Sequence, residues 1–117
     1  MPKARPFLAE FELLVMLALV RLGPGAYGAA ILREIEDRTG RPVSMGAVYA
    51  TLGRLEDKGF LKSQVSEPEP VRGGRSKKYY HLSEAGRRVL RQSASVLTRM
   101  LDGVDLIGHT RGGGGTR

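Results

Sequence analysis

The sequence predicts a mainly α-helical fold with one small β-hairpin. Four stretches carry apolar residues at helical spacing, and glycines and prolines separate them. Two short, partly alternating stretches flank a segment rich in proline and glycine, residues 67–76, that is unsuited to the interior of a strand. The chain has 117 residues, of which 41% are hydrophobic, and this suits a single domain with one modest core.

The first helix is expected over residues 8–22, "LAEFELLVMLALVRL". One side carries an apolar stripe at helical spacing, made of Leu8, Phe11, Leu14, Val15, Ala18 and Leu22. Much of the opposite side is apolar too, with Leu13, Leu17, Leu19 and Val20. A helix that is apolar nearly all round is buried on both sides, so we expect a partner chain to cover part of it.

Glycine and proline at 23–25 end that helix, and a second helix is expected at about 27–38. Ser44 is a plausible N-cap for a third helix, at about 45–58, and Gly59 suits the position after its end. The core-facing stripe of this third helix is Val48, Leu52 and Leu55. A second face carries small residues first and cations last: Ala47, Thr51, Arg54 and Lys58.

Strands are expected at 60–66 and 77–82, joined by a long hairpin tip. A fourth helix, at about 84–102, starts after Ser83 and carries apolar residues along one side. This order divides the chain into a winged helix-turn-helix domain (8–82), a C-terminal dimerisation helix (83–105) and a disordered tail (106–117). In such a module the third helix enters the major groove of DNA, and the hairpin tip lies along the backbone or in the minor groove.

The charge balance favours an anionic partner. Lys and Arg number 19 against 12 Asp and Glu, which gives a net charge of +7 and a pI near 10.2. Cysteine is absent, which excludes disulfides and thiolate metal sites. We expect no metal site, cofactor or catalysis, because there are only two histidines and no catalytic or phosphate-binding motif. Without a membrane-spanning run or a signal peptide, a cytoplasmic protein is expected.

The hairpin tip and the third helix supply the candidate DNA contacts. The tip cations are either solvated or placed on DNA, with Arg72 and Arg75 near the minor groove and Lys77 and Lys78 on phosphates. Tyr49 either packs on the second helix or donates to a phosphate, and Arg54 either pairs with Asp57 or binds phosphate. Ala47 and Thr51 are candidates for base contact. The full predicted set is Ser44, Ala47, Tyr49, Ala50, Thr51, Arg54, Lys58, Arg72, Arg75, Lys77 and Lys78.

The first and last helices supply a predicted homodimer interface. The fourth helix continues its apolar stripe beyond what one winged helix can cover. The predicted interface residues are Phe11, Val15, Leu19, Leu90, Leu97, Leu101 and Val104.

Two stretches resemble the PadR family of bacterial transcription regulators. "GAVYATLGRLEDKGFL" at 46–61 is similar to its recognition helix, and "GGRSKKYYHLSEAG" at 73–86 to its wing and second strand. The likeness covers roughly 8–104. Ala50 stands where members often have proline, and Tyr27 precedes Gly28 where members often have tyrosine after the glycine.

The single C-terminal helix looks like the short subfamily, in which the last and first helices build a homodimer. The resemblance implies a sequence-specific dimeric repressor on a pseudo-palindromic operator; some members release DNA on binding small aromatic molecules, so an effector is left open. The alternative function is a basic winged-helix adaptor that binds an acidic protein or RNA.

Overall fold

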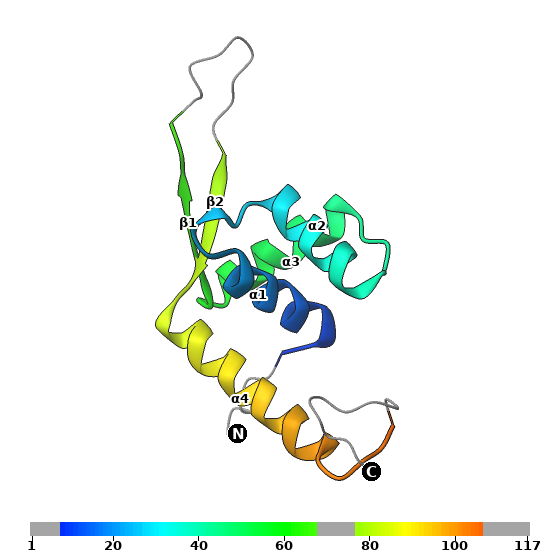
Figure 1. Ribbon diagram of the computed structural model, residues 1–117. Coiled ribbons are helices and arrows are strands. Elements are labelled where there is room, and N and C mark those ends of the chain that lie inside the picture. The colour runs from blue at the N-terminus through cyan, green and yellow to red at the C-terminus, as the bar shows by residue number, and fades with distance from the viewer. Residues whose placement is uncertain (1–7, 68–76, 107–117) are drawn as a thin grey trace.

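The computed structural model describes residues 8–67 and 77–106. Its elements follow the expected order (Figure 1), and the predicted fold class is confirmed: a winged helix-turn-helix followed by a C-terminal helix. The elements are α1 (Glu10–Leu22), the short 3-10 helix η1 (Gly23–Gly25), α2 (Gly28–Thr39), α3 (Met45–Asp57), β1 (Leu61–Val65), β2 (Lys78–Leu82) and α4 (Glu84–Leu101). Each bound lies within two residues of the sequence prediction. The expected tail beyond residue 106 lies outside the described residues.

Serine caps start two of the helices as predicted. The Ser44 hydroxyl accepts a 3.0 Å hydrogen bond from the backbone N–H of Ala47, which begins α3. The Ser83 hydroxyl accepts a 3.0 Å bond from the N–H of Gly86, which begins α4. At the other end of α2, Gly40 ends the helix in the left-handed conformation, with a φ of 73° that favours glycine.

The hairpin is an antiparallel pair in which Leu61 faces Leu82 and Val65 faces Lys78. The chain just before α2 extends this pair, because Tyr27 bridges to Tyr79 and the N–H of Tyr80 donates 2.9 Å to the carbonyl of Ala26. The two tyrosines of β2 point to opposite faces. One of them is a core residue: Tyr80, at 6% exposed.

Helix α1 runs through the middle of the molecule and contacts α2, α3, β2 and α4 (Figure 1). Its own chain therefore covers most of both sides. For this reason the prediction that Val15, Leu19 and Leu90 lie in the dimer interface is wrong. Val15 is fully buried within the single chain, and Leu19 and Leu90 are 3% and 7% exposed. Phe11 is half-buried against the same core.

Helix α4 is fixed to the winged helix at its first turn. The Ser83 hydroxyl donates a 2.6 Å hydrogen bond to the carbonyl of Gly59. One turn on, Gly86 lies so close to the backbone carbonyl of Phe60 that a β-carbon would collide with it. Only glycine allows α4 to start at this point.

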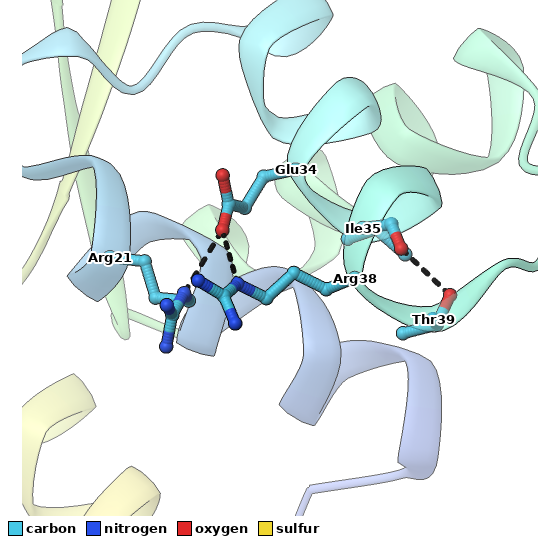
Figure 2. A network of polar contacts seen from close by, with 5 residues as sticks. All are labelled: Arg21, Glu34, Ile35, Arg38 and Thr39. Carbon is cyan, nitrogen blue, oxygen red and sulfur yellow. Dashed lines mark hydrogen bonds and ion pairs between the residues drawn. The ribbon is translucent and has the colours of Figure 1, made fainter.

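A surface network joins α1 to α2. Figure 2 shows Arg21 of α1 and Arg38 of α2 donating to the same oxygen of Glu34, at 2.9 and 3.0 Å. The hydrogen bonds from Arg38 and Arg21 lower the pKa of Glu34. In the next turn, the Thr39 hydroxyl donates 2.7 Å to the carbonyl of Ile35 (Figure 2).

Candidate nucleic-acid interface

The N-terminal half of α3 presents small side chains to solvent. Ser44, Ala47 and Ala50 are exposed, as is Gly46. None of them is among the buried residues of α3, which are Val48, Thr51, Leu52 and Leu55. The predicted contacts at Ser44, Ala47 and Ala50 thus come from one accessible surface, which we call the α3 outer face.

Tyr49 lies at the edge of the α3 outer face and leaves half of its surface exposed. Its ring packs against Gly28 at the start of α2, where a β-carbon would come within 2.5 Å of the ring. Tyr49 therefore packs on α2, one of the two alternatives left open by the sequence. Because half of its surface is exposed, the packing leaves the other alternative open as well.

Thr51 does not belong to the α3 outer face, and the prediction that it contacts bases is wrong. It is 2% exposed, and its hydroxyl accepts a 3.1 Å hydrogen bond from Nη2 of Arg54. The buried arc of α3 spans i, i+3, i+4 and i+7 from Val48, which is wider than the stripe assumed from the sequence. Thr51 falls inside this arc.

Two cations at the end of α3, Arg54 in its last turn and Lys58 at its C-cap, lie toward α1. Lys58 donates a 3.0 Å hydrogen bond from Nζ to Oε2 of Glu12, and Nε of Arg54 lies 3.8 Å from the same oxygen. The carboxylate beside Arg54 is thus that of Glu12 and not that of Asp57, which was one of the two alternatives left open by the sequence. Both cations remain about half exposed, at 56% for the Arg54 side chain and 46% for that of Lys58.

Glu12 was not among the residues singled out from the sequence. Burial raises the pKa of Glu12, but hydrogen bonds from Ala9 and Lys58 and the charges of Lys58 and Arg54 outweigh it and hold the pKa below its usual value. The signal was present: Glu12 is a carboxylate directly beside Leu13 in a helix that is apolar nearly all round, and once buried it requires a cation from another element. Which cation meets it depends on the packing of α1 on α3.

The base of the wing carries two of the predicted cations. Nζ of Lys77 lies 4.6 Å from the ring centre of Tyr27, a cation–π contact. Nζ of Lys78 lies 3.8 Å from Oε1 of Glu56, whose other oxygen accepts a 2.6 Å hydrogen bond from Ser63. Glu56 thereby joins α3 to both strands. The other two predicted cations, Arg72 and Arg75, lie outside the described residues.

A second surface is apolar. Leu97, Leu101 and Val104, predicted for the dimer interface, are 46–52% exposed. Exposed apolar residues extend this surface along α4 and beyond its end. We call the set the α4 apolar face: Val96, Leu97, Met100, Leu101, Val104 and Leu106.

The described residues hold neither a metal-binding cluster nor a membrane-spanning helix. They contain no group of three or more histidines or acidic residues able to hold a metal ion. Among these same residues, no helix combines the length and apolar character needed to cross a bilayer.

Comparison with known proteins places the chain. The model of the transcriptional regulator PadR-like family matches residues 16–92. The transcriptional regulator Rv3488 of Mycobacterium tuberculosis is 36% identical over 91 residues, which cover 75% of this chain and 78% of that protein.

Solved structures agree. A PadR family transcriptional regulator from Eggerthella lenta is 34% identical with a TM-score of 0.63, over 84% of this chain and 83% of that one. A PadR-like transcription factor from Bacteroides fragilis is 26% identical with a TM-score of 0.66, over 83% of this chain and 88% of that one. The family resemblance found in the sequence is confirmed: the chain belongs to the PadR-like family of transcriptional regulators.

Proposed function

We propose that the chain is a cytoplasmic, sequence-specific DNA-binding repressor that acts as a homodimer on a pseudo-palindromic operator. The observation that carries the proposal is the α3 outer face. In a winged helix-turn-helix this helix is the one that enters the major groove. A surface of serine and alanine there allows the backbone to come close to base edges.

The chemistry of the α3 outer face suits this contact. The methyl groups of Ala47 and Ala50 are of the kind that touch a thymine methyl. The Tyr49 hydroxyl lies at the edge of the face, where it would donate to a phosphate oxygen and fix the position of α3. The net charge of +7 adds the attraction for the backbone that such a protein needs.

The homodimer rests on the α4 apolar face. Exposed apolar side chains that are contiguous and large mark an interaction surface. A two-fold axis would pair the face with itself, because an isologous interface uses the same patch on both subunits. Two copies of α3 would then meet two half-sites about one or two helical turns apart.

Response to an effector is the remaining part of the proposal. A hollow of about 450 Å³ lies between the end of α1, β2 and the start of α4. Val20 and Leu82 give it apolar walls, Tyr79 and Tyr80 of β2 lie along it, and Arg87 gives it a cation. This lining suits a small aromatic anion, and a rise in melting temperature with such a compound would support binding.

Selection from a randomised duplex library tests the proposed function. The wild-type protein should enrich a pseudo-palindrome and bind it more tightly than a scrambled duplex of the same composition. Structured RNA and an acidic peptide serve as competitors for the alternative function, an adaptor. Preference for either competitor over the selected duplex would replace the DNA-binding repressor with that adaptor.

A further inference from the structure

The carboxylate of Glu12 joins the start of α1 to the end of α3. The residue is 5% exposed, although its neighbours on α1 are mostly apolar core residues. Its Oε1 accepts a 3.0 Å hydrogen bond from the backbone N–H of Ala9. Its Oε2 meets Lys58 at 3.0 Å and Arg54 at 3.8 Å. One oxygen of this side chain therefore caps α1 itself, and the other pairs with the end of α3.

The pairing cannot be given up without a cost. A buried carboxylate is tolerated only while it is paired and hydrogen-bonded. Lys58 and Arg54 are the two cations within ion-pair distance of Glu12 in the described part of the chain. Moving both cations to DNA phosphates would leave Glu12 buried and unpaired. Both cations are therefore held in the protein, toward α1.

The consequence falls on the orientation of α3. A helix turns by about 100° per residue, so Ala47 and Ala50 lie about 60° apart around its axis, and the rotation of α3 determines which of them faces a base. Lys58 and Arg54 hold α3 at its C-terminal end, opposite the half that carries these alanines. Helix α1, to which they are joined, also contacts α4. Glu12 thus joins α3 to a helix that packs on α4, which carries the proposed dimer surface.

Building on the proposed function, we propose that Glu12 is a positioning residue for DNA recognition. Through Lys58 and Arg54 it fixes α3 against α1, and so determines which half-site sequence and which half-site spacing the dimer accepts. The residue acts on α3 from inside the protein and makes no contact with DNA.

Glu12→Gln tests this, because it keeps the size of the side chain and an acceptor for Ala9 but removes the charge. Glu10→Gln is the matched control: Glu10 lies in the same first turn of α1, but it pairs at the surface with Arg41, at 3.3 Å. The probes are the duplex selected by the wild-type protein, the same duplex with its half-sites moved apart or together by one base pair, and a scrambled duplex.

We expect Glu12→Gln to lose about 10- to 100-fold in affinity for the selected duplex, the size of one good base contact. Binding to the scrambled duplex should change less than about threefold, as expected when phosphate contacts are kept. The loss caused by altered spacing should shrink. Glu10→Gln should match the wild type. If Glu12→Gln does not fold, Lys58→Gln removes the same ion pair from its more exposed partner and must give the same loss of selectivity.

The double variant Glu12→Gln/Lys58→Gln identifies the route. If Glu12 acts through Lys58, the double variant should lose no more selectivity than the more affected single variant. Additive losses, or equal losses on selected and scrambled duplex, would overturn the positioning role. A wild-type protein that prefers no duplex would overturn the proposed function and this inference together. A selective wild type with an equally selective Glu12→Gln variant would overturn the inference alone.

Discussion

The ring of Tyr49 lies directly over Gly28, so that the helix proposed to read DNA rests on the first residue of α2. A β-carbon at Gly28 would come within 2.5 Å of the outer end of the ring. That end is the tip of a flexible, half-exposed side chain, which can swing away. Gly28 therefore determines where the Tyr49 hydroxyl lies more than it determines whether the chain folds.

Gly28→Ala should change DNA binding with little effect on stability. The free energy of unfolding should stay within about 1 kcal/mol of the wild type, since alanine is the better helix former by a similar amount. Duplex affinity should fall, and Tyr49→Phe should reproduce the fall, about 10-fold for a hydrogen bond to a charged group. Chemical denaturation and fluorescence anisotropy check the two expectations. If the affinity of Tyr49→Phe for the duplex is unchanged, the proposed contact between the Tyr49 hydroxyl and a phosphate is wrong.

Two glycines in helices should respond in opposite ways to alanine. At Gly86 a β-carbon meets the backbone carbonyl of Phe60, which cannot move aside, so Gly86→Ala should lower the free energy of unfolding by at least about 1–3 kcal/mol. A β-carbon at Gly53 would meet no atom within 4 Å beyond its own helix backbone and chain neighbours. Gly53→Ala should therefore raise the free energy of unfolding by about 0.5–1 kcal/mol. Urea denaturation of both variants measures the difference. Equal effects would mean that α4 does not cross Phe60 as described.

The elements were predictable from the sequence because their signals are local. Ser44 and Ser83 cap helices, and Gly40 and Gly59 adopt positive φ after helix ends. These features depend on neighbouring residues in the chain and not on how the helices pack against one another. The depth of burial was not predictable in the same way. Val15 lies inside the core because α2, α3, β2 and α4 of the same chain contact α1; the pattern of α1 predicts its burial but not whether its own chain or a partner covers it.

The same limit explains the errors in the candidate site. The pattern of α3 places Ala47 and Thr51 on one face, yet Ala47 is exposed and Thr51 is buried. The burial of Thr51 depends on α1 lying against that side, and so does the pairing of Lys58 with Glu12, 46 residues away in the chain. An ion pair between distant residues leaves no periodic signal in either helix.

Glu12 should make stability depend on pH in the acid range. Its pKa is lower in the folded chain than in the unfolded chain, where the pKa of a glutamate is about 4.3. Its stabilising contribution is therefore complete above that value and is lost as the pH falls through the lower, folded value. Between about pH 6 and pH 3, the free energy of unfolding of Glu12→Gln should fall less than that of the wild type, by about 1.4 kcal/mol for each unit of pKa difference. Parallel curves for the two proteins would contradict the pairing.

Leu97→Asp should give a folded monomer that has lost specific DNA binding. Leu97 is 47% exposed in the single chain, so a carboxylate there is solvated in the monomer but buried without a partner in the proposed dimer. Ser95→Asp, on an exposed position of the same helix, is the control and should remain dimeric. Sedimentation at micromolar concentration distinguishes the species. A dimeric Leu97→Asp, or a monomeric wild type, would exclude the α4 apolar face as the interface.

The salt dependence of affinity for the selected duplex, measured beside a scrambled duplex, tests the DNA-binding claim most directly. A dimer that neutralises about 6–10 phosphates should lose about 10³- to 10⁵-fold in affinity between about 50 and 200 mM salt. At each salt concentration the selected duplex should remain at least about 10³-fold tighter than the scrambled one. A nearly flat salt response, or equal affinity for the two duplexes, would contradict sequence-specific DNA binding by this chain.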